Sequence, residues 1–259
     1  MLIHKVADQA LNIVKDTADY IRTARTQLLQ GEITYKADMS LVTTIDVGAE
    51  QRLVSGLGKL VPGVKFLAEE QHKTNRSELM WIIDPIDGTT NFVHGFPMFC
   101  ISVALYRDGK IELGIIYEIT SQECFWSHSG IDVVKLNQKP VRVSQARTIA
   151  ESVLATGFPS RSFDQMDHFF EVFKKMMVGT HGLRRLGSAA MDLAYVASGR
   201  CDGFFEYSLS PWDVAAGAYL VQKAGGRVTD FKGGDNFLFD GEILASNHWI
   251  HDEFLKYFE

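Results

Sequence analysis

Two aspartates, Asp84 and Asp87, follow the most apolar strand-like run of the chain, Leu79–Ile83. Pro85 fixes its own φ angle and favours an extended conformation for Asp84, and Gly88 permits a turn that a residue with a Cβ atom resists. Carboxylates at the end of a buried strand lose hydration, so they need cations or hydrogen-bond donors nearby. Mg²⁺, which prefers oxygen ligands, is the simplest such cation. A solvated turn with a helix cap is the alternative that the bare D-x-x-D pair leaves open.

The elements that must position these carboxylates follow from apolar periodicity and turn residues. We expect helices over residues 2–29, 46–60, 163–177, 188–198 and 211–223, with a final helix capped by Asn247. We expect strands over residues 64–68, 79–83, 99–106, 111–117, 123–127, 152–156, 203–206, 227–230 and 243–245. The middle strands form an antiparallel meander, and the second half alternates helices with strands. These patterns predict an α+β fold in two closely packed parts, an N-terminal half (1–148) and a C-terminal half (149–259).

The composition allows a large core and disfavours several classes of ligand. The chain has 259 residues, of which 46% are hydrophobic, and its net charge is −6 without a basic stripe. Direct nucleic-acid binding is therefore not expected. The three scattered cysteines, Cys100, Cys124 and Cys201, indicate free thiols in a reducing compartment. Because no apolar run approaches the length of a membrane span, we expect a cytoplasmic protein without membrane segments.

Several segments together resemble one enzyme family. Residues 81–92, WIIDPIDGTTNF, resemble the metal-binding signature of the inositol monophosphatase family, within the Mg²⁺-dependent, Li⁺-sensitive phosphatases. Residues 66–70 look like the family's strand that ends in a metal-binding glutamate, and residues 40–46 look like the segment that ends in a water-activating aspartate. Residues 210–217 resemble the second family signature, and residues 187–190 resemble its substrate loop. These segments occur in the family's order and span most of the chain.

The resemblance implies a layered α-β-α-β-α sandwich of the inositol monophosphatase and fructose-1,6-bisphosphatase type, with the active site between the halves. It also implies a homodimer and two to three Mg²⁺ ions per active site. The implied metal ligands are Glu69, Asp84, the Ile86 carbonyl, Asp87 and Asp213. Four acids in one site would repel one another strongly without cations, which agrees with bound metal. Ser40 stands where the animal enzymes of the family have an aspartate, so this chain departs from the family pattern in the loop near the third ion.

Asp46 and Thr89 resemble the family's pair that orients and deprotonates the attacking water. A threonine hydroxyl accepts a hydrogen bond from water readily when its own proton is donated elsewhere, and the Asp46 carboxylate can accept that proton. The alternative for Asp46 is a plain cap of the helix that follows it, and the two roles are compatible.

Substrate contacts follow from the same resemblance. The implied substrate-binding residues are Gly88, Thr89, Gly187, Ser188, Ala189, Glu206 and Asp213. The backbone N–H groups of Gly88 and Thr89 would hold phosphate oxygens, and Glu206 would accept hydrogen bonds from neighbouring hydroxyls of a polyol. An exposed acid at the end of a strand is the alternative for Glu206.

The leading hypothesis is therefore a Mg²⁺-dependent phosphomonoesterase. It would hydrolyse myo-inositol 1-phosphate, or a similar polyol phosphate, to inositol and phosphate by in-line attack of metal-activated water. Fructose-1,6-bisphosphatase and 3′-phosphoadenosine phosphatase activity are the alternatives among enzymes. A regulatory protein-binding role beside catalysis is the alternative from another class, because some bacterial relatives take part in RNA-polymerase or ribosomal complexes.

Overall fold

Helices and strands follow one another closely along the chain, in the order that the sequence predicts for the longer elements. The computed structural model describes residues 2–26, 33–35, 41–72, 76–159 and 162–258. The helices are α1 (Ile3–Arg25), α2 (Thr44–Leu57), α3 (Thr89–His94), α4 (Met166–Gly179), α5 (Ala189–Ala197), α6 (Pro211–Lys223) and α7 (His251–Leu255). The strands are β1 (Ile33–Tyr35), β2 (Leu41–Thr43), β3 (Lys65–Ala68), β4 (Leu79–Asp87), β5 (Cys100–Arg107), β6 (Lys110–Glu118), β7 (Cys124–His128), β8 (Val134–Leu136), β9 (Lys139–Val141), β10 (Val153–Thr156), β11 (Gly182–Arg184), β12 (Gly203–Tyr207), β13 (Arg227–Thr229) and β14 (Glu242–Ser246). Two short 3₁₀ turns are η2 (Ile149–Glu151) and η3 (Asn236–Leu238).

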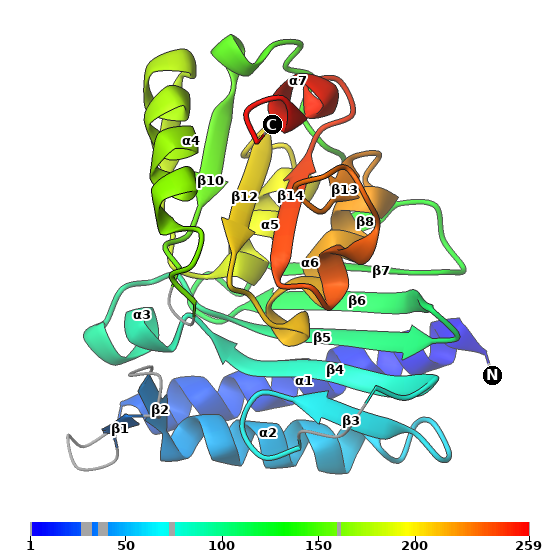
Figure 1. Ribbon diagram of the computed structural model, residues 1–259. Helices are drawn as coiled ribbons and strands as arrows, with labels where there is room; N and C mark the ends of the chain where they lie inside the picture. The colour runs from blue at the N-terminus through cyan, green and yellow to red at the C-terminus, as the bar shows by residue number, and fades with distance from the viewer. Residues whose placement is uncertain (1, 27–32, 36–40, 73–75, 160–161, 259) are drawn as a thin grey trace.

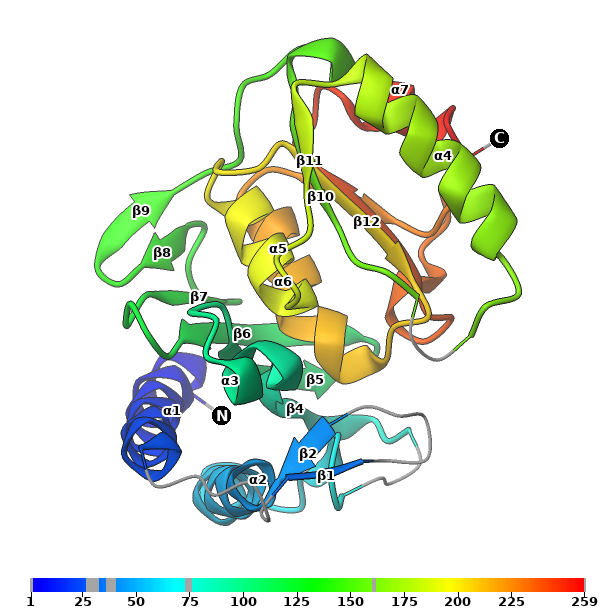
Figure 2. The ribbon, with the colours of Figure 1, turned by 90° about the vertical axis from the view of Figure 1, so that its left-hand side faces the viewer.

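Two sheets separate the helices into three layers (Figures 1 and 2). Helices α1 and α2 cover the outer face of the first sheet, and α5 and α6 lie between the two sheets. Helices α4 and α7 cover the outer face of the second sheet. The order of layers is α-β-α-β-α, which confirms the predicted α+β sandwich. Each sheet is buried on both faces, and this explains why its central strands are apolar throughout.

The first sheet has the strand order β3-β4-β5-β6-β7-β8-β9. Only the β3–β4 pair is parallel among its described strands. Successive side chains of β4 point to opposite faces: Met80 and Ile82 enter the core shared with α5 and α6, whereas Trp81 and Ile83 enter the core under α1 and α2. Strand β4 is therefore fixed from both sides before it reaches Asp84.

The second sheet has the strand order β11-β10-β12-β14-β13. Neighbouring residues of β12 again face different cores, Phe204 toward α5 and α6 and Phe205 toward α4 and α7. The chain passes from the first sheet to the second between residues 142 and 152. Because α5 and α6 share one core with both sheets, the two parts pack as one unit. A domain boundary at residues 148/149 stays a prediction.

Some local expectations need correction. Helix α2 begins at Thr44, because Thr43 is its N-cap and accepts from the N–H groups of Ile45 and Asp46. Asn247 does not directly cap the last helix: its Oδ1 accepts from the N–H groups of Trp249 and Ile250, and α7 begins one residue later. The sequence also gave no indication of α3 or β11.

Other expectations can be compared directly with the described residues. The three cysteines are free, with Cys100 and Cys201 buried and Cys124 half-buried, as predicted. Helix α1 ends at Arg25 with Thr26 as its C-cap, whereas residues 27–29 of the expected helix lie outside the described residues, as does Ser40. No helix in the described part of the chain has both the length and the apolar character needed to cross a membrane.

Candidate active site

The irregular end of β4 presents two of the candidate ligands. Asp84 pairs with Ser102 and Asp87 pairs with Cys100. The register therefore shifts between the two pairs, because β4 advances by three residues while β5 advances by two. Such a bulge re-aims side chains locally. The Ile86 N–H donates to Asp84 Oδ1 at 3.0 Å, which closes the turn that the D-P-I-D sequence predicts.

Three carboxylates converge from β4 and α6. One oxygen each from Asp84, Asp87 and Asp213 lies within 4.8 Å of the others. Among the described residues, no other group of three or more His, Cys, Asp or Glu side chains meets in this way. All three are buried, with exposed fractions of 1%, 9% and 6%. The structure thus brings together residues that are far apart in the sequence, as the metal hypothesis requires.

Helix N-termini hold these acids in place. Asp213 stands in the first turn of α6, which begins with Pro211, and its Oδ2 accepts from the Ser210 N–H at 2.7 Å. Asp87 Oδ2 accepts from the Ser188 hydroxyl and from the Ala190 N–H at the start of α5, both at 2.7 Å. The positive end of a helix dipole favours a carboxylate at such a position.

The same acids destabilise one another electrostatically. Burial raises the pKa of Asp84 well above its ordinary value, and the acidic neighbours Glu69, Asp87 and Asp213 raise it further. Burial and Asp213 also raise the pKa of Asp87, although its hydrogen bonds with Ser188 and Ala190 oppose this. The strongest charged neighbours of Asp84 are all acidic, with Glu69 first, so this oxygen-only group fits a hard divalent cation such as Mg²⁺.

Asp46 and Thr89 face one another beside this cluster. Thr89 Oγ1 lies 3.3 Å from Asp46 Oδ1 and 3.0 Å from the Ile86 carbonyl, so its single proton has two acceptors. Asp46 is not the N-cap but the third residue of α2, where its Oδ2 accepts from the Thr43 N–H at 2.9 Å. Burial raises the pKa of Asp46 to about 6, although the bonds from Thr43 oppose this.

The loop before α5 packs directly against the end of β4. Gly88 has φ +91°, and a Cβ atom there would lie 3.0 Å from the Met98 carbonyl oxygen and 3.1 Å from that of Gly187. This close approach and the left-handed backbone together require glycine. The Asn91 side-chain amide donates to the carbonyls of Met98 and Leu186, both at 2.7 Å, and so ties α3 to the same loop.

Three of the implied substrate residues, Gly187, Ser188 and Ala189, belong to the loop before α5 and its first helical residue. The Ser188 hydroxyl donates to Asp87, so it supports a candidate ligand, and Ser188 and Ala189 are both buried. Gly187 has φ +86°, and its backbone lies against the Asn91 side chain. Their contacts with a substrate stay predictions.

Glu206 lies on β12, in the second sheet, and is half-buried. A Cβ atom at Gly157 would lie 2.1 Å from its carboxylate, so the Glu206 side chain packs directly against the Gly157 backbone. Another acid, Asp192 on α5, is buried, and its Oδ1 has no hydrogen-bond partner among the described residues. Burial raises the pKa of Asp192 well above its ordinary value, and Glu206 and Asp87 raise it further.

The sequence reasoning missed Gly157, Asp192 and Asn91. Asp192 left a signal, since it is an acid inside the apolar helical run 189–197. Asn91 lies inside the signature of residues 81–92, but the contacts of Asn91 and Gly157 could not be predicted, because their partners are distant in the sequence.

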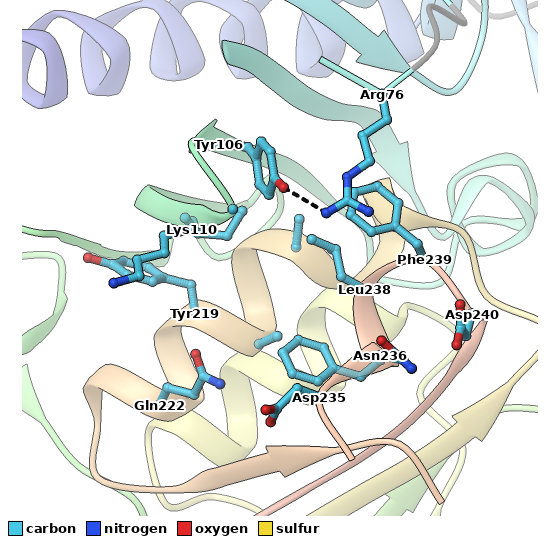
Figure 3. Close-up of a pocket in the computed structure, with 15 residues that line it drawn as sticks. Arg76, Tyr106, Lys110, Tyr219, Gln222, Asp235, Asn236, Leu238, Phe239 and Asp240 are labelled. Atoms are coloured by element: carbon cyan, nitrogen blue, oxygen red, sulfur yellow. Dashed lines mark hydrogen bonds between the residues drawn. The ribbon is translucent and has the colours of Figure 1, made fainter. Parts of the chain in front are cut away.

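A separate pocket of about 580 Å³ opens between the β5–β6 turn, α6 and η3 (Figure 3). Arg76 lies over the Phe239 ring at 4.4 Å and donates to the Tyr106 hydroxyl at 3.0 Å. None of the candidate site residues lines this pocket. The acid chemistry therefore resides at the end of β4 rather than in this pocket.

Neutralising one acid should stabilise the metal-free protein. With EDTA at pH 8, Asp84→Asn removes one of several repelling buried charges, so we expect the melting temperature to rise by about 3 °C or more. Addition of Mg²⁺ should stabilise the wild type much more than this variant. Differential scanning calorimetry measures both effects.

Asp235→Asn, which changes an exposed acid of the separate pocket, is the control and should behave like the wild type. Equal Mg²⁺ stabilisation of D84N and wild type would contradict the metal assignment.

The stability of the metal-free protein should also depend on pH. The pKa values of Asp46, Asp84 and Asp87 are raised in the folded state, so the folded chain binds protons that the unfolded chain releases. Lowering the pH from 8 to 5.5 with EDTA should therefore increase the unfolding free energy, by about 1–3 kcal/mol. Saturating Mg²⁺ should reduce or reverse this trend, because a cation favours ionised acids. Urea unfolding at each pH measures the unfolding free energy. A decrease in this free energy from pH 8 to pH 5.5 in the metal-free protein would contradict the prediction.

Comparison with known proteins agrees with this geometry. Residues 3–259 match the model of the inositol monophosphatase family. The chain is 38% identical to "Nus factor SuhB" of Pseudomonas aeruginosa over 244 residues, which cover 92% of this chain and 90% of that protein. It is 39% identical to "Inositol-1-monophosphatase" of Mesorhizobium japonicum over 227 residues, which cover 87% of this chain and 85% of that protein.

A solved structure is similar over the whole length. The extragenic suppressor protein SuhB of Bartonella henselae superimposes with a TM-score of 0.90 at 35% identity, covering 100% of this chain and 99% of that one. Its fold and the family match extend over the helices and strands that carry the acid cluster. The chain described here belongs to the inositol monophosphatase family.

Proposed function

We propose that this protein is a Mg²⁺-dependent phosphomonoesterase that hydrolyses myo-inositol 1-phosphate or a similar polyol phosphate to the polyol and phosphate. The observation that carries the proposal is the meeting of three buried carboxylates, Asp84, Asp87 and Asp213, within 4.8 Å. Family membership supports phosphatase chemistry, and the Mesorhizobium relative named Inositol-1-monophosphatase supports the substrate class.

Two to three Mg²⁺ ions would be held by the acid cluster. The proposed ligands are Glu69, Asp84, the Ile86 carbonyl, Asp87 and Asp213. The Ile86 carbonyl is one of two acceptors near the Thr89 hydroxyl, and a carbonyl oxygen has two lone pairs, so it can also face a cation. Bound Mg²⁺ would supply charge neutralisation of the phosphate and would lower the pKa of water.

Thr89 and Asp46 would prepare the attacking water. When the Thr89 hydroxyl donates to Asp46 Oδ1, its oxygen lone pairs are free to accept a hydrogen bond from water. Asp46 can then take a proton through this hydroxyl, because its Oδ2 is held by Thr43 while Oδ1 faces Thr89. Water would attack phosphorus in line with the departing alkoxide, so no phosphoenzyme is needed.

Recognition of the substrate would involve the start of α3 and strand β12. The N–H groups of Gly88 and Thr89 are proposed to bind phosphate oxygens, and Glu206 is proposed to accept from polyol hydroxyls. Gly187, Ser188, Ala189 and Asp213 complete the proposed substrate set. Fructose 1,6-bisphosphate and 3′-phosphoadenosine 5′-phosphate remain the competing esters.

Removal of the Thr89 hydroxyl should slow hydrolysis without unfolding the protein. We expect Thr89→Val to lower kcat on myo-inositol 1-phosphate by at least about 100-fold, since the proton path to Asp46 is lost. Thr90→Val, at the exposed next position, should keep nearly full activity. The measurement is phosphate release with Mg²⁺ and with EDTA, repeated on the two competing esters.

Each outcome of this assay has a definite meaning. Mg²⁺-dependent preference for the inositol ester supports the proposal, and preference for another ester replaces the substrate while keeping the site. Full activity of the Thr89→Val variant would overturn the role of Thr89.

A second candidate function is a regulatory protein-binding role beside catalysis. It is favoured by the relatives named Nus factor SuhB, such as the one from Pseudomonas aeruginosa. Because D84N changes only a buried group, it should retain any partner that binds the outer surface. Affinity capture with D84N and wild type as baits tests this, and loss of every partner in D84N would argue against a role separate from the site.

Three further expectations stay predictions: a homodimer, the absence of direct nucleic-acid binding, and a cytoplasmic location. The homodimer is supported by apolar side chains that α4 leaves exposed, Phe170, Met177 and Val178.

A further inference from the structure

A second acid of α2 lies one helical turn after Asp46 and is completely buried. Glu50 has an exposed fraction of 0%. Its Oε2 accepts from the Glu70 N–H at 2.7 Å, and its Oε1 accepts from the N–H groups of Gln71 and His72 at 2.8 and 3.1 Å. The Nδ1 atom of His72 lies 2.7 Å from the same Oε1. One carboxylate thus holds three consecutive backbone N–H groups and a ring nitrogen.

These N–H groups belong to the loop that carries Glu69. The Glu69 N–H donates to the Ile83 carbonyl at 3.2 Å, and the Ala68 N–H donates to the His72 carbonyl at 2.9 Å. Every backbone N–H from Ala68 to His72 therefore has an acceptor, and Glu50 provides three of them. The loop is fixed at both ends and in the middle.

Such a buried carboxylate is expensive unless it is well hydrogen-bonded. Burying an ionised group is unfavourable, and an apolar residue would suffice if α2 only needed to pack. Charge-assisted bonds to successive N–H groups instead fix the backbone, because each bond has a defined direction. The bond from Glu69 to Ile83 then joins this rigid loop to β4, one residue before Asp84.

We propose that Glu50 is a positioning residue for the metal site: by holding residues 70–72, it fixes the loop that carries Glu69 against β4, one residue before Asp84, so that Glu69 and Asp84 can bind the same cation. The inference rests on the proposed function for its metal, but its test does not depend on catalysis. Residues that orient metal ligands from behind typically change metal affinity by about 10–100-fold when replaced.

The test replaces the acceptor while keeping its shape. In Glu50→Gln, either orientation of the amide places an NH₂ group against a backbone N–H. Isothermal titration calorimetry of the metal-free protein with MgCl₂ alone should show a Kd about 10-fold higher than in the wild type. In hydrolysis assays, half-maximal rate should need correspondingly more Mg²⁺, and kcat should recover at saturating Mg²⁺. A purely structural role would instead lower the active fraction at every Mg²⁺ concentration.

Asp230, which directly follows β13 of the second sheet, provides a matched control. It is also buried, with an exposed fraction of 7%, and its carboxylate accepts from the N–H groups of Lys232 and Gly234 at 2.9 and 2.8 Å. Asp230→Asn removes a loop-holding carboxylate of the same kind away from the acid cluster. Its Kd for Mg²⁺ should equal that of the wild type.

The outcomes are distinguishable. A folded E50Q with an unchanged Kd overturns the proposal, and so does an equal loss of affinity in D230N. If E50Q does not fold, Glu50→Asp, which keeps the charge but is shorter by one methylene, is measured with the same expectation and the same contrary result. Wild-type protein that binds Mg²⁺ but hydrolyses no ester would refute the phosphatase function alone. An active wild type with unchanged E50Q affinity would refute only the role of Glu50.

Discussion

Repulsion among buried carboxylates is the constraint on which the rest of this structure depends. Asp84, Asp87 and Asp213 cannot share one buried place as ions without strong compensation. The fold supplies part of it from helix N-termini: α6 binds one oxygen of Asp213 and α5 binds one oxygen of Asp87. Asp46 is held in the same way by the start of α2. These hydrogen bonds hold the carboxylates in place and offset part of their mutual repulsion.

The layered sandwich makes this convergence possible. Strand β4 is clamped between two cores, so its bulged end can present acids without local flexibility. Helices α5 and α6 lie between the sheets and bring their N-termini to that end, while α2 reaches it from the outer layer. Helix α2 carries both Asp46 and Glu50 on successive turns, and so one element serves the Thr89 hydroxyl and the Glu69 loop together.

Sequence reasoning found what is encoded locally. Strand β4 and its D-P-I-D turn follow from apolar character and from proline and glycine, and Pro211 marked the first residue of α6 correctly. It could not find Glu50, because an acid in an amphipathic helix normally indicates a solvated face, and only tertiary structure shows it to be buried. The bonds of Asn91 to Met98 and Leu186 were equally hidden, since helical and strand periods do not specify which loops meet.

The acid cluster also bears on the choice between hydrolysis and partner binding. Relatives named Nus factor SuhB and Inositol-1-monophosphatase are 38% and 39% identical to this chain, so overall identity does not separate the two roles. The stability of the protein bears on this choice, because buried acids that repel one another reduce stability in the absence of metal. A protein that used only its outer surface would be more stable with neutral residues at Asp84 and Asp87. The presence of these acids beside the Thr89–Asp46 pair is therefore a physical reason to retain phosphoryl chemistry, whatever partner the outer surface binds.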